Sequence, residues 1–261
     1  MPGLLPTFFN LPKPAVIAHR GASFYAPENT LSAFEIAIKQ NADAIELDVC
    51  LSKDGHVIVI HGPKVDRTTN GQGLVADMTL KQLQNLDAGS HFDPAYNHEK
   101  IPTLPEIFDH FGQQITINIE LKNYSPFDDA LPTKVAVLID ELNLQNFVLI
   151  SSFNIFSLVK IRRLQPEVPT ALLTLKGVKG NIARHFLSRL HKINALHPHY
   201  QDLSENLIKF AQKRRVRIHP YTINRHEDIK HVYQFGIDGI ITDDPHLAIN
   251  IRAELFSGVT K

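Results

Sequence analysis

Short apolar segments alternate with longer amphipathic segments along most of the chain. The apolar segments are rich in β-branched or alternating residues and predict strands at residues 15–20, 44–49, 115–122, 147–153, 169–175, 193–198, 216–223 and 237–243. Helical periodicity fills the intervals at residues 30–40, 131–144, 154–164, 204–215 and 226–236. This alternation predicts a closed parallel (β/α)8 barrel, the TIM barrel, for which a single domain of about 250 residues is usual. We therefore predict one domain over residues 1–261.

One connection of this predicted barrel is unusually long. About 65 residues separate the second strand from the third, several times more than a crossover needs, so a segment is inserted there. The insertion begins with DVCLSKDGHVIVIH, in which Asp54-Gly55 predicts a two-residue hairpin turn. That turn pairs Lys53 with His56 and places Asp48 opposite His61, with about 5 Å between their Cβ atoms. A surface hairpin with a solvated histidine is the alternative.

The composition limits the kinds of partner. Lys and Arg together number 27, as do Asp and Glu, so no net charge draws the chain to nucleic acid or to an anionic membrane. The single cysteine, Cys50, excludes an internal disulfide. The start, MPGLLPTFFNLPKP, lacks the run of about 18 apolar residues that a membrane span needs, and its Phe8 and Phe9 are predicted to plug the barrel floor. We predict a cytoplasmic protein without a transmembrane segment that binds a small molecule and not nucleic acid.

Charged residues occur with a period of two in two of the predicted strands. In AIELDV, Glu46 and Asp48 share one face and the apolar residues take the other, and in INIELK the same holds for Glu120 and Lys122. Both polar faces point into the barrel near the strand ends where barrel enzymes form their sites. Three buried carboxylates repel one another, and a hard divalent cation with oxygen ligands resolves the conflict. A structural ion-pair network with Arg20 and Lys122 is the alternative.

Two histidines are expected at the same end of the barrel. The first strand ends in His19 and Arg20, and the hairpin returns His61 to the top of the second strand. A phosphodiester needs positive charge around its oxygens, a base for the attacking oxygen and an acid for the leaving one. Arg20, Lys122 and a metal would supply the charge, and the two histidines the proton transfers. Histidines that are merely hydrogen-bonded at strand ends are the alternative.

Motifs spread over nearly the whole chain resemble those of one enzyme family. In order, they are HRGASFYAPENTLSAF, GHVIVIH, DRTTNGQG, LDAGSHF, IPTLPEIF, NIELK, YTIN and DGIITDDP. They resemble the signatures of the glycerophosphodiester phosphodiesterases, whose barrel is related to that of the phosphatidylinositol-specific phospholipases C. The resemblance implies the same (β/α)8 barrel, with the hairpin and a cap-like insertion at residues 62–114 between the second and third barrel strands.

The resemblance also implies a role for each candidate residue. It implies that His19 and His61 are the acid/base pair. It implies a site for one Mg²⁺ or Ca²⁺ ion formed by Glu46, Asp48 and Glu120, and it implies that Arg20 and Lys122 bind the phosphate. One position departs from the family, which usually has Asp after the second histidine, whereas this chain has Gly62. If that Asp orients the histidine, His61 needs another partner here.

Further residues are candidates for substrate contact. They are Glu28, Asn29, Phe153, Tyr221 and Asn224. Glu28 and Asn29 can equally cap the first helix, and core packing explains the two aromatic residues nearly as well.

The sequence thus predicts metal-dependent hydrolysis of glycerophosphodiesters to sn-glycerol 3-phosphate and an alcohol. Two histidines beside one phosphate, together with the resemblance, favour attack by the neighbouring glycerol hydroxyl and a cyclic phosphate intermediate. A lysophospholipase D-type phosphodiesterase and a barrel that binds glycerophosphodiesters without turnover are the alternatives. The chain is also a candidate homodimer.

Overall fold

The computed structural model describes residues 7–123, 130–187 and 191–256. Its strands are β1 (Ala15–His19), β2 (Ala44–Leu51), β3 (Val57–Val59), β4 (Thr116–Leu121), β5 (Val148–Ser152), β6 (Thr170–Thr174), β7 (Ala195–Pro198), β8 (Arg217–Ile218) and β9 (Gly239–Thr242). Its α-helices are α1 (Leu31–Lys39), α2 (Leu80–Gln84), α3 (Leu104–Phe111), α4 (Leu131–Glu141), α5 (Ile155–Leu164), α6 (Val178–Ile182), α8 (Glu205–Arg214), α9 (His226–Tyr233) and α10 (Pro245–Phe256). Short helical turns are η1 (Phe8–Asn10), η2 (Val75–Asp77), η3 (Pro94–Tyr96), η4 (Ala183–Leu187) and η5 (Tyr200–Asp202).

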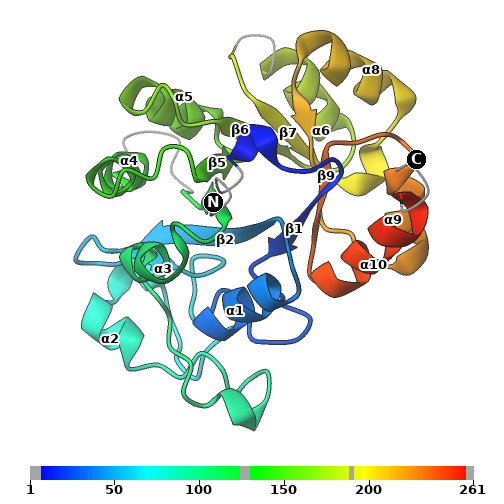
Figure 1. The fold of residues 1–261 in the computed structure, drawn as a ribbon. Helices are drawn as coiled ribbons and strands as arrows, with labels where there is room; N and C mark the ends of the chain where they lie inside the picture. The colour runs from blue at the N-terminus through cyan, green and yellow to red at the C-terminus, as the bar shows by residue number, and fades with distance from the viewer. Residues whose placement is uncertain (1–6, 124–129, 188–190, 257–261) are drawn as a thin grey trace, which may run out of the picture.

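All of these strands except β3, which pairs with β2, form one nearly closed parallel barrel, with helices around its outside (Figure 1). The order around the sheet is β8, β7, β6, β5, β4, β2, β1 and β9, and all of these neighbours are parallel. Backbone hydrogen bonds from Asp238 N to Ile218 O and from Ile241 N to Pro220 O link the two ends. The predicted TIM barrel is confirmed, and each predicted strand overlaps an observed one, although β8 is much shorter than the predicted 216–223.

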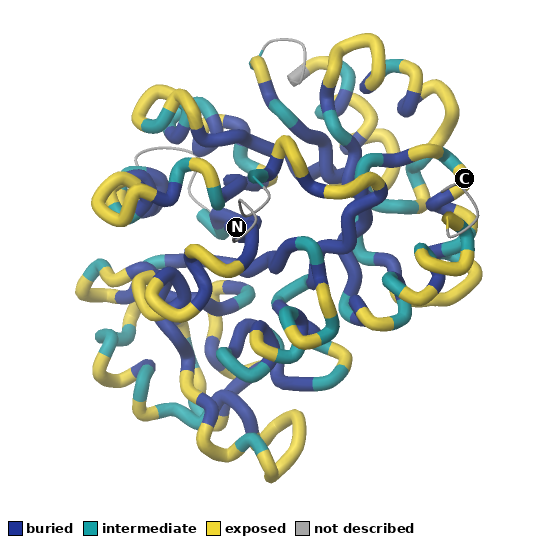
Figure 2. The backbone as a smooth tube through the Cα atoms, viewed as in Figure 1, coloured by how far each residue is buried: buried dark blue, intermediate teal, exposed yellow. Residues whose placement is uncertain are grey.

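The period of two places apolar side chains between the strands and the helices. Ile45 and Leu47 of β2, like Ile117 and Ile119 of β4, are fully buried in the main hydrophobic core. Figure 2 shows this burial as continuous dark strands inside exposed helical faces. The opposite face of each strand points into the barrel. None of the helices in residues 7–123, 130–187 and 191–256 combines the length and hydropathy of a membrane span.

The N-terminal segment closes the floor of the barrel. Phe8 is buried in an inner cluster with residues from the strand starts, such as Ala15 and Ala44, so the predicted plug is confirmed for this residue. The prediction is wrong for Phe9, which is 50% exposed. The physical reason is Arg217, whose guanidinium donates to the backbone oxygens of both phenylalanines and fixes the segment with the second ring outside.

The hairpin that begins the insertion has a different register from the predicted one. The antiparallel pairs are Val49 with Val59, Cys50 with Ile58, and Leu51 with Val57. Ser52 N donates to His56 O, so the turn contains three residues, 53–55, instead of two. Gly55, the last of them, has a φ of 79°, as three-residue hairpin loops require.

This register moves Asp48 away from its predicted partner. Asp48 lies opposite Ile60, whose N–H donates to Asp48 O at 3.0 Å, and not opposite His61. The predicted cross-strand pair is therefore wrong. The physical reason lies in Asp54, whose carboxylate accepts hydrogen bonds from Leu80 N and Ser52 Oγ at 3.0 and 2.7 Å and so stabilises the longer loop.

Part of the insertion has a hydrophobic core of its own. We call residues 60–101 the cap. Its buried apolar residues form one cluster with Cys50 of β2 and Ile58 of β3, and they are Ile60, Val65, Val75, Leu83, Ala88 and Ile101. Tyr96 joins the cap to the barrel by donating from its hydroxyl to Tyr25 O at 3.0 Å. The following helix, α3, instead packs Leu104 and Ile107 into the main core, and the boundary of the insertion at residues 62–114 stays a prediction.

Candidate active site

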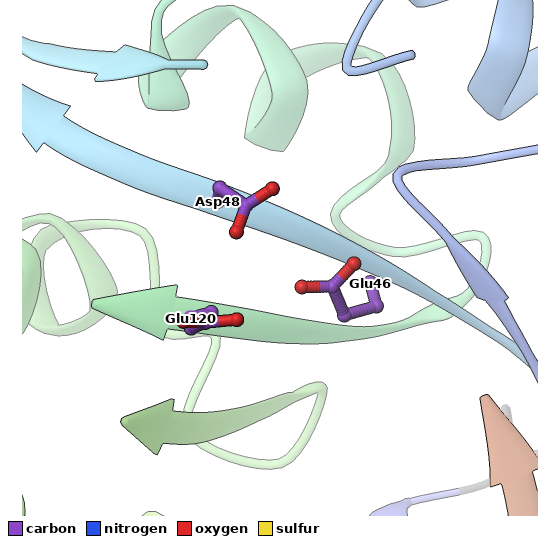
Figure 3. Close-up of side chains that lie close together, drawn as sticks. All are labelled: Glu46, Asp48 and Glu120. Atoms are coloured by element: carbon purple, nitrogen blue, oxygen red, sulfur yellow. The ribbon is translucent and has the colours of Figure 1, made fainter. Parts of the chain in front are cut away.

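Three acidic side chains converge from the middle of β2 and the C-terminal end of β4. The parallel register pairs Asp48 with Glu120, and Glu46 lies on the same face of β2 as Asp48. Figure 3 shows the three carboxylates close together, and one oxygen from each lies within 4.8 Å of the others. Only 3%, 0% and 7% of Glu46, Asp48 and Glu120 are exposed. The structure therefore brings together the three carboxylates that the period of two placed on one face.

Burial and mutual repulsion control the charge of this cluster. Burial raises the pKa of Glu46 well above its usual value, and Asp48 and Glu120 raise it further. Burial also raises the pKa of Glu120 to about 7, again with a contribution from Asp48. Although burial would raise the pKa of Asp48, Arg20 and Lys122 lower it to about 2. Asp48 therefore holds its charge most readily, whereas burial and mutual repulsion disfavour the charged forms of Glu46 and Glu120 unless positive charge is added nearby.

The donor set of the cluster suits a hard divalent cation. Asp48 Oδ1 is buried and forms no hydrogen bond with the described residues. Carboxylate oxygens are the ligands that Mg²⁺ and Ca²⁺ prefer, and a dication would offset the repulsion between Glu46, Asp48 and Glu120. These residues therefore fit one such ion.

Two cations lie against the carboxylates. Arg20 Nε is 3.1 Å from Asp48 Oδ2, and Arg20 Nη1 donates to both carboxylate oxygens of Glu28 at 3.1 and 3.2 Å. Lys122 Nζ donates to Glu120 Oε1 at 2.8 Å and is 3.6 Å from Asp48 Oδ1. The ion-pair network that the sequence left as an alternative is therefore present beside the acidic cluster. The same two cations are placed to bind an anion next to it.

The residues of the PENT motif stabilise the cluster from the loop after β1. Asn29 Nδ2 donates to Asp48 Oδ2 at 3.1 Å, and Asp48 N donates to Asn29 Oδ1 at 3.2 Å. Thr30, and not its two predecessors, caps α1 by accepting from Ala33 N. The alternative interpretation, in which Glu28 or Asn29 caps α1, is therefore wrong. The Asn29 amide is hydrogen-bonded to Asp48, and the Glu28 carboxylate is bound by arginine side chains.

His19 is held by a carboxylate from the other end of the chain. His19 Nδ1 lies 2.6 Å from Asp243 Oδ1, and the two residues are 224 positions apart. Asp243 also accepts hydrogen bonds from Ser23 Oγ and Asn224 Nδ2. Burial would raise the pKa of Asp243, but the hydrogen bond from His19 and those of the other donors lower it. Asn224, a candidate for substrate contact, therefore orients the carboxylate that orients His19.

His61 is held by a cation instead. Its Nδ1 is 3.1 Å from Nη2 of Arg67, a residue of the cap that is 53% exposed. Burial lowers the pKa of His61 to about 4, and Arg20 and Lys122 lower it as well, against the effect of Asp48. The next residue, Gly62, has a φ of 97°, in the left-handed region that favours glycine. The partner that His61 has in place of a following Asp is Arg67.

The two aromatic candidates lie beside the cluster. The Phe153 ring centroid is 5.8 Å from Lys122 Nζ, and a groove lined by Glu120, Lys122 and Phe153 opens there. Tyr221 packs edge to face against Phe153, with ring centroids 6.1 Å apart, and its hydroxyl donates to Thr174 O at 3.0 Å. Both rings can therefore form one wall of the site.

Sequence reasoning did not single out Asp243, Ser23 or Arg67. Each lies in a motif that the sequence shows, respectively DGIITDDP, HRGASFYAPENTLSAF and DRTTNGQG. A charged residue directly after an apolar strand was the available signal for Asp243. The sequence gives no local sign that His19 is the partner of Asp243, because the two residues meet only when the barrel closes.

Comparison with known proteins gives a consistent result. A model of the Glycerophosphoryl diester phosphodiesterase family matches residues 19–247. A glycerophosphodiester phosphodiesterase of Caldanaerobacter subterraneus subsp. tengcongensis is 42% identical over 240 residues, which cover 92% of this chain and 98% of the relative. A glycerophosphodiester phosphodiesterase of Bacillus subtilis is 36% identical over 251 residues, which cover 90% of this chain and 85% of the relative.

Solved structures share the fold. The glycerophosphodiester phosphodiesterase of Agrobacterium tumefaciens is 29% identical, with a TM-score of 0.79 over 91% of this chain and 99% of that one. A phosphodiesterase of Oleispira antarctica, solved in complex with the product sn-glycerol-3-phosphate, is 30% identical, with a TM-score of 0.77 over 92% and 97%. Since the family match spans the acidic cluster and both histidines, the chain belongs to the glycerophosphoryl diester phosphodiesterase family of enzymes.

Proposed function

We propose that the protein hydrolyses glycerophosphodiesters to sn-glycerol 3-phosphate and an alcohol. The observation that carries the proposal is the buried cluster of Glu46, Asp48 and Glu120 with two cations against it and two histidines nearby. The family supports it, and so does the product complex of the Oleispira antarctica phosphodiesterase.

The acidic cluster would hold one divalent ion, Mg²⁺ or Ca²⁺. Bound there, such an ion supplies positive charge to phosphate oxygens. Arg20 and Lys122 are proposed to bind the same phosphate, because both lie within 4 Å of Asp48. Together these groups offset the charge that the phosphoryl oxygens carry in the transition state.

His19 and His61 are the proposed acid/base pair. The glycerol hydroxyl next to the ester attacks phosphorus, one histidine takes its proton, and the bond from phosphorus to the alcohol oxygen breaks as the other histidine protonates that oxygen. Water then opens the cyclic phosphate with the roles reversed and yields sn-glycerol 3-phosphate. Because the attacking hydroxyl is tethered to the phosphate, its effective molarity can reach roughly 10⁵ to 10⁸ M.

Turnover of glycerophosphocholine, followed by a coupled assay for sn-glycerol 3-phosphate, tests the activity. A barrel that only binds the ligand would show binding without product, and that result would refute the proposal. The 2-deoxy analogue of glycerophosphocholine tests the cyclic route, since it lacks the attacking hydroxyl and should react orders of magnitude more slowly. Equal kcat values for the two substrates would mean that water, and not the glycerol hydroxyl, attacks phosphorus. That result would leave the proposed phosphodiesterase activity unaffected.

A lysophospholipid is the second candidate substrate. The observation that favours it is the exposed apolar surface of Leu175, Val178 and Ile182, which follow β6 and could contact an acyl chain. Assays with lysophosphatidylcholine beside glycerophosphocholine decide between the two. Cytoplasmic location and a homodimer stay predictions, to be tested by cell fractionation and light scattering.

A further inference from the structure

The hydrogen bond between Arg67 and His61 fixes the position of the histidine proton. A guanidinium carries only donors, so at 3.1 Å Arg67 Nη2 must donate and His61 Nδ1 must accept. A neutral imidazole has one N–H, and with Nδ1 as acceptor that proton lies on Nε2. The doubly protonated ring is incompatible with this contact, because it has no lone pair to offer.

Arg67 is itself held in place. Its Nη1 donates to Glu28 Oε2 at 2.7 Å and its Nη2 to Glu28 Oε1 at 2.5 Å, a bidentate pair. Bidentate pairs of this kind fix the plane of the guanidinium. Glu28 also accepts from Arg20, so one carboxylate connects a cation beside the acidic cluster with the cap residue that contacts His61.

Burial and the charges around His61 favour its neutral imidazole over the doubly protonated ring. Burial lowers its pKa to about 4, and Arg20 and Lys122 lower it as well, against the opposite effects of Asp48 and Glu28. A neutral imidazole can still polarise or protonate an oxygen that has gained most of a negative charge.

We propose that Arg67 is a positioning residue that holds His61 as the neutral Nε2–H tautomer, so that His61 serves the leaving alcohol oxygen and not the attacking hydroxyl. The inference rests on the proposed function. As the bond from phosphorus to the alcohol oxygen breaks, its electron pair stays on that oxygen and the Nε2 proton moves there. The water that opens the cyclic phosphate returns a proton to Nε2. The adjacent guanidinium stabilises the negative charge that the ring carries in between.

A donor to the leaving oxygen matters most when the leaving group is a poor one. An alkyl alcohol departs with nearly a full negative charge, whereas 4-nitrophenolate is stable without a proton. Loss of Arg67 should therefore slow hydrolysis of glycerophosphocholine much more than hydrolysis of the 4-nitrophenyl ester of glycerol 3-phosphate. A residue that bound the phosphate itself would affect both substrates equally.

The experiment compares Arg67→Met, Arg67→Lys and the control Lys64→Met on both substrates. Lys64 is exposed in the same segment of the cap, so its replacement removes the same charge. We expect Arg67→Met to lower kcat about 10- to 100-fold for glycerophosphocholine and less than about 3-fold for the nitrophenyl ester. Arg67→Lys keeps a donor and should recover part of the loss, and Lys64→Met should match the wild type. Equal losses for both substrates, or none for glycerophosphocholine, would overturn the inference and leave the proposed function standing.

A second measurement does not depend on turnover. Two-bond proton–nitrogen NMR correlation of the ¹⁵N-labelled protein identifies which ring nitrogen of each histidine is protonated, and the signal of His61 is assigned by its loss in His61→Gln. We expect Nε2–H in the wild type and a mixture of tautomers in Arg67→Met. An Nδ1–H signal for His61 in the wild type would contradict the proposal, even if neither substrate were turned over.

Discussion

The barrel side and the cap side of the site are held by different kinds of contact. On the barrel side, Glu46, Asp48 and Glu120 project from strands whose backbone ladder fixes their register. On the cap side, His61 lies beyond β3 and is held by a side-chain hydrogen bond from the half-exposed Arg67. Glu28 connects the two sides by binding both Arg20 and Arg67.

This difference determines how well each side of the site tolerates substitutions. A strand residue cannot move without breaking several backbone hydrogen bonds, so the relative positions of the carboxylates are rigid. The orientation of His61 depends instead on an ion pair near the surface, and such pairs contribute little stability on their own. Substitutions on the barrel side should therefore abolish activity, whereas those on the cap side should reduce it in steps.

The largest effect is expected when the acidic cluster loses its ion or one ligand. Exhaustive chelation should abolish turnover, and Mg²⁺ or Ca²⁺ should restore it. Glu120→Gln should lower metal affinity in calorimetric titrations and reduce kcat about 1,000-fold or more, because an amide oxygen carries no charge. The control Glu141→Gln changes an exposed carboxylate of α4 and should have no effect. Full turnover with no metal detected by elemental analysis would contradict the assignment.

The next largest effect is expected at the carboxylate behind His19. Asp243→Asn removes the charge that orients the imidazole and allows the amide to stabilise the wrong tautomer, so kcat should fall about 100- to 1,000-fold with little change in KM. Steady-state kinetics check this, with the exposed Asp109→Asn as the control. A kcat within threefold of the wild type would show that His19 does not depend on Asp243.

An intermediate effect is expected at the connection between the two sides. Glu28→Gln removes the charge that holds both guanidiniums, and we expect kcat/KM for glycerophosphocholine to fall about 10-fold. Combined with Arg67→Met, the change should be smaller than the product of the two single effects, because both act through one network. Independent, multiplicative effects in this double-mutant cycle would show that the two sides are not connected through Glu28.

The smallest effect on activity is expected when a histidine pair that has no role in the proposed reaction is replaced. His197 and His219 are buried in the barrel, with Nε2 of the first and Nδ1 of the second 3.3 Å apart. Burial lowers the pKa of His197 well below its usual value and that of His219 to about 3. Unfolded histidine has a pKa of about 6.5, so the unfolded chain binds more protons at acid pH.

The free energy of unfolding should therefore fall as the pH drops below about 6.5 toward the folded pKa values, by up to about 1.4 kcal/mol per pH unit for each histidine. Urea denaturation at pH 7 and pH 5 measures the fall. The double variant His197→Leu with His219→Leu should lose less stability over the same interval and keep its kcat at pH 7. An identical fall in both proteins would mean that the pair does not control acid stability.

The period-two pattern was enough to predict the barrel and the acidic face. Successive residues of a strand point to opposite sides, so the alternation in AIELDV and INIELK places Glu46, Asp48 and Glu120 on one face before any long-range contact is known. The hairpin shows the limit of local signals. The pair Asp54-Gly55 correctly indicated a turn, but the contact of Asp54 with Leu80 decided its length and so displaced His61 from its predicted position opposite Asp48.

By itself, the sequence determined which side chains share a strand face, because that depends only on the two-residue repeat of an extended backbone. Only the tertiary structure decided which partners those side chains have. Asp243 reaches His19 because closure of the barrel places β9 beside β1. Arg67 reaches His61 because the path of the cap returns its guanidinium to the site and Glu28 fixes it there. Such contacts depend on loop paths, and a change of one residue in register is enough to replace one partner with another.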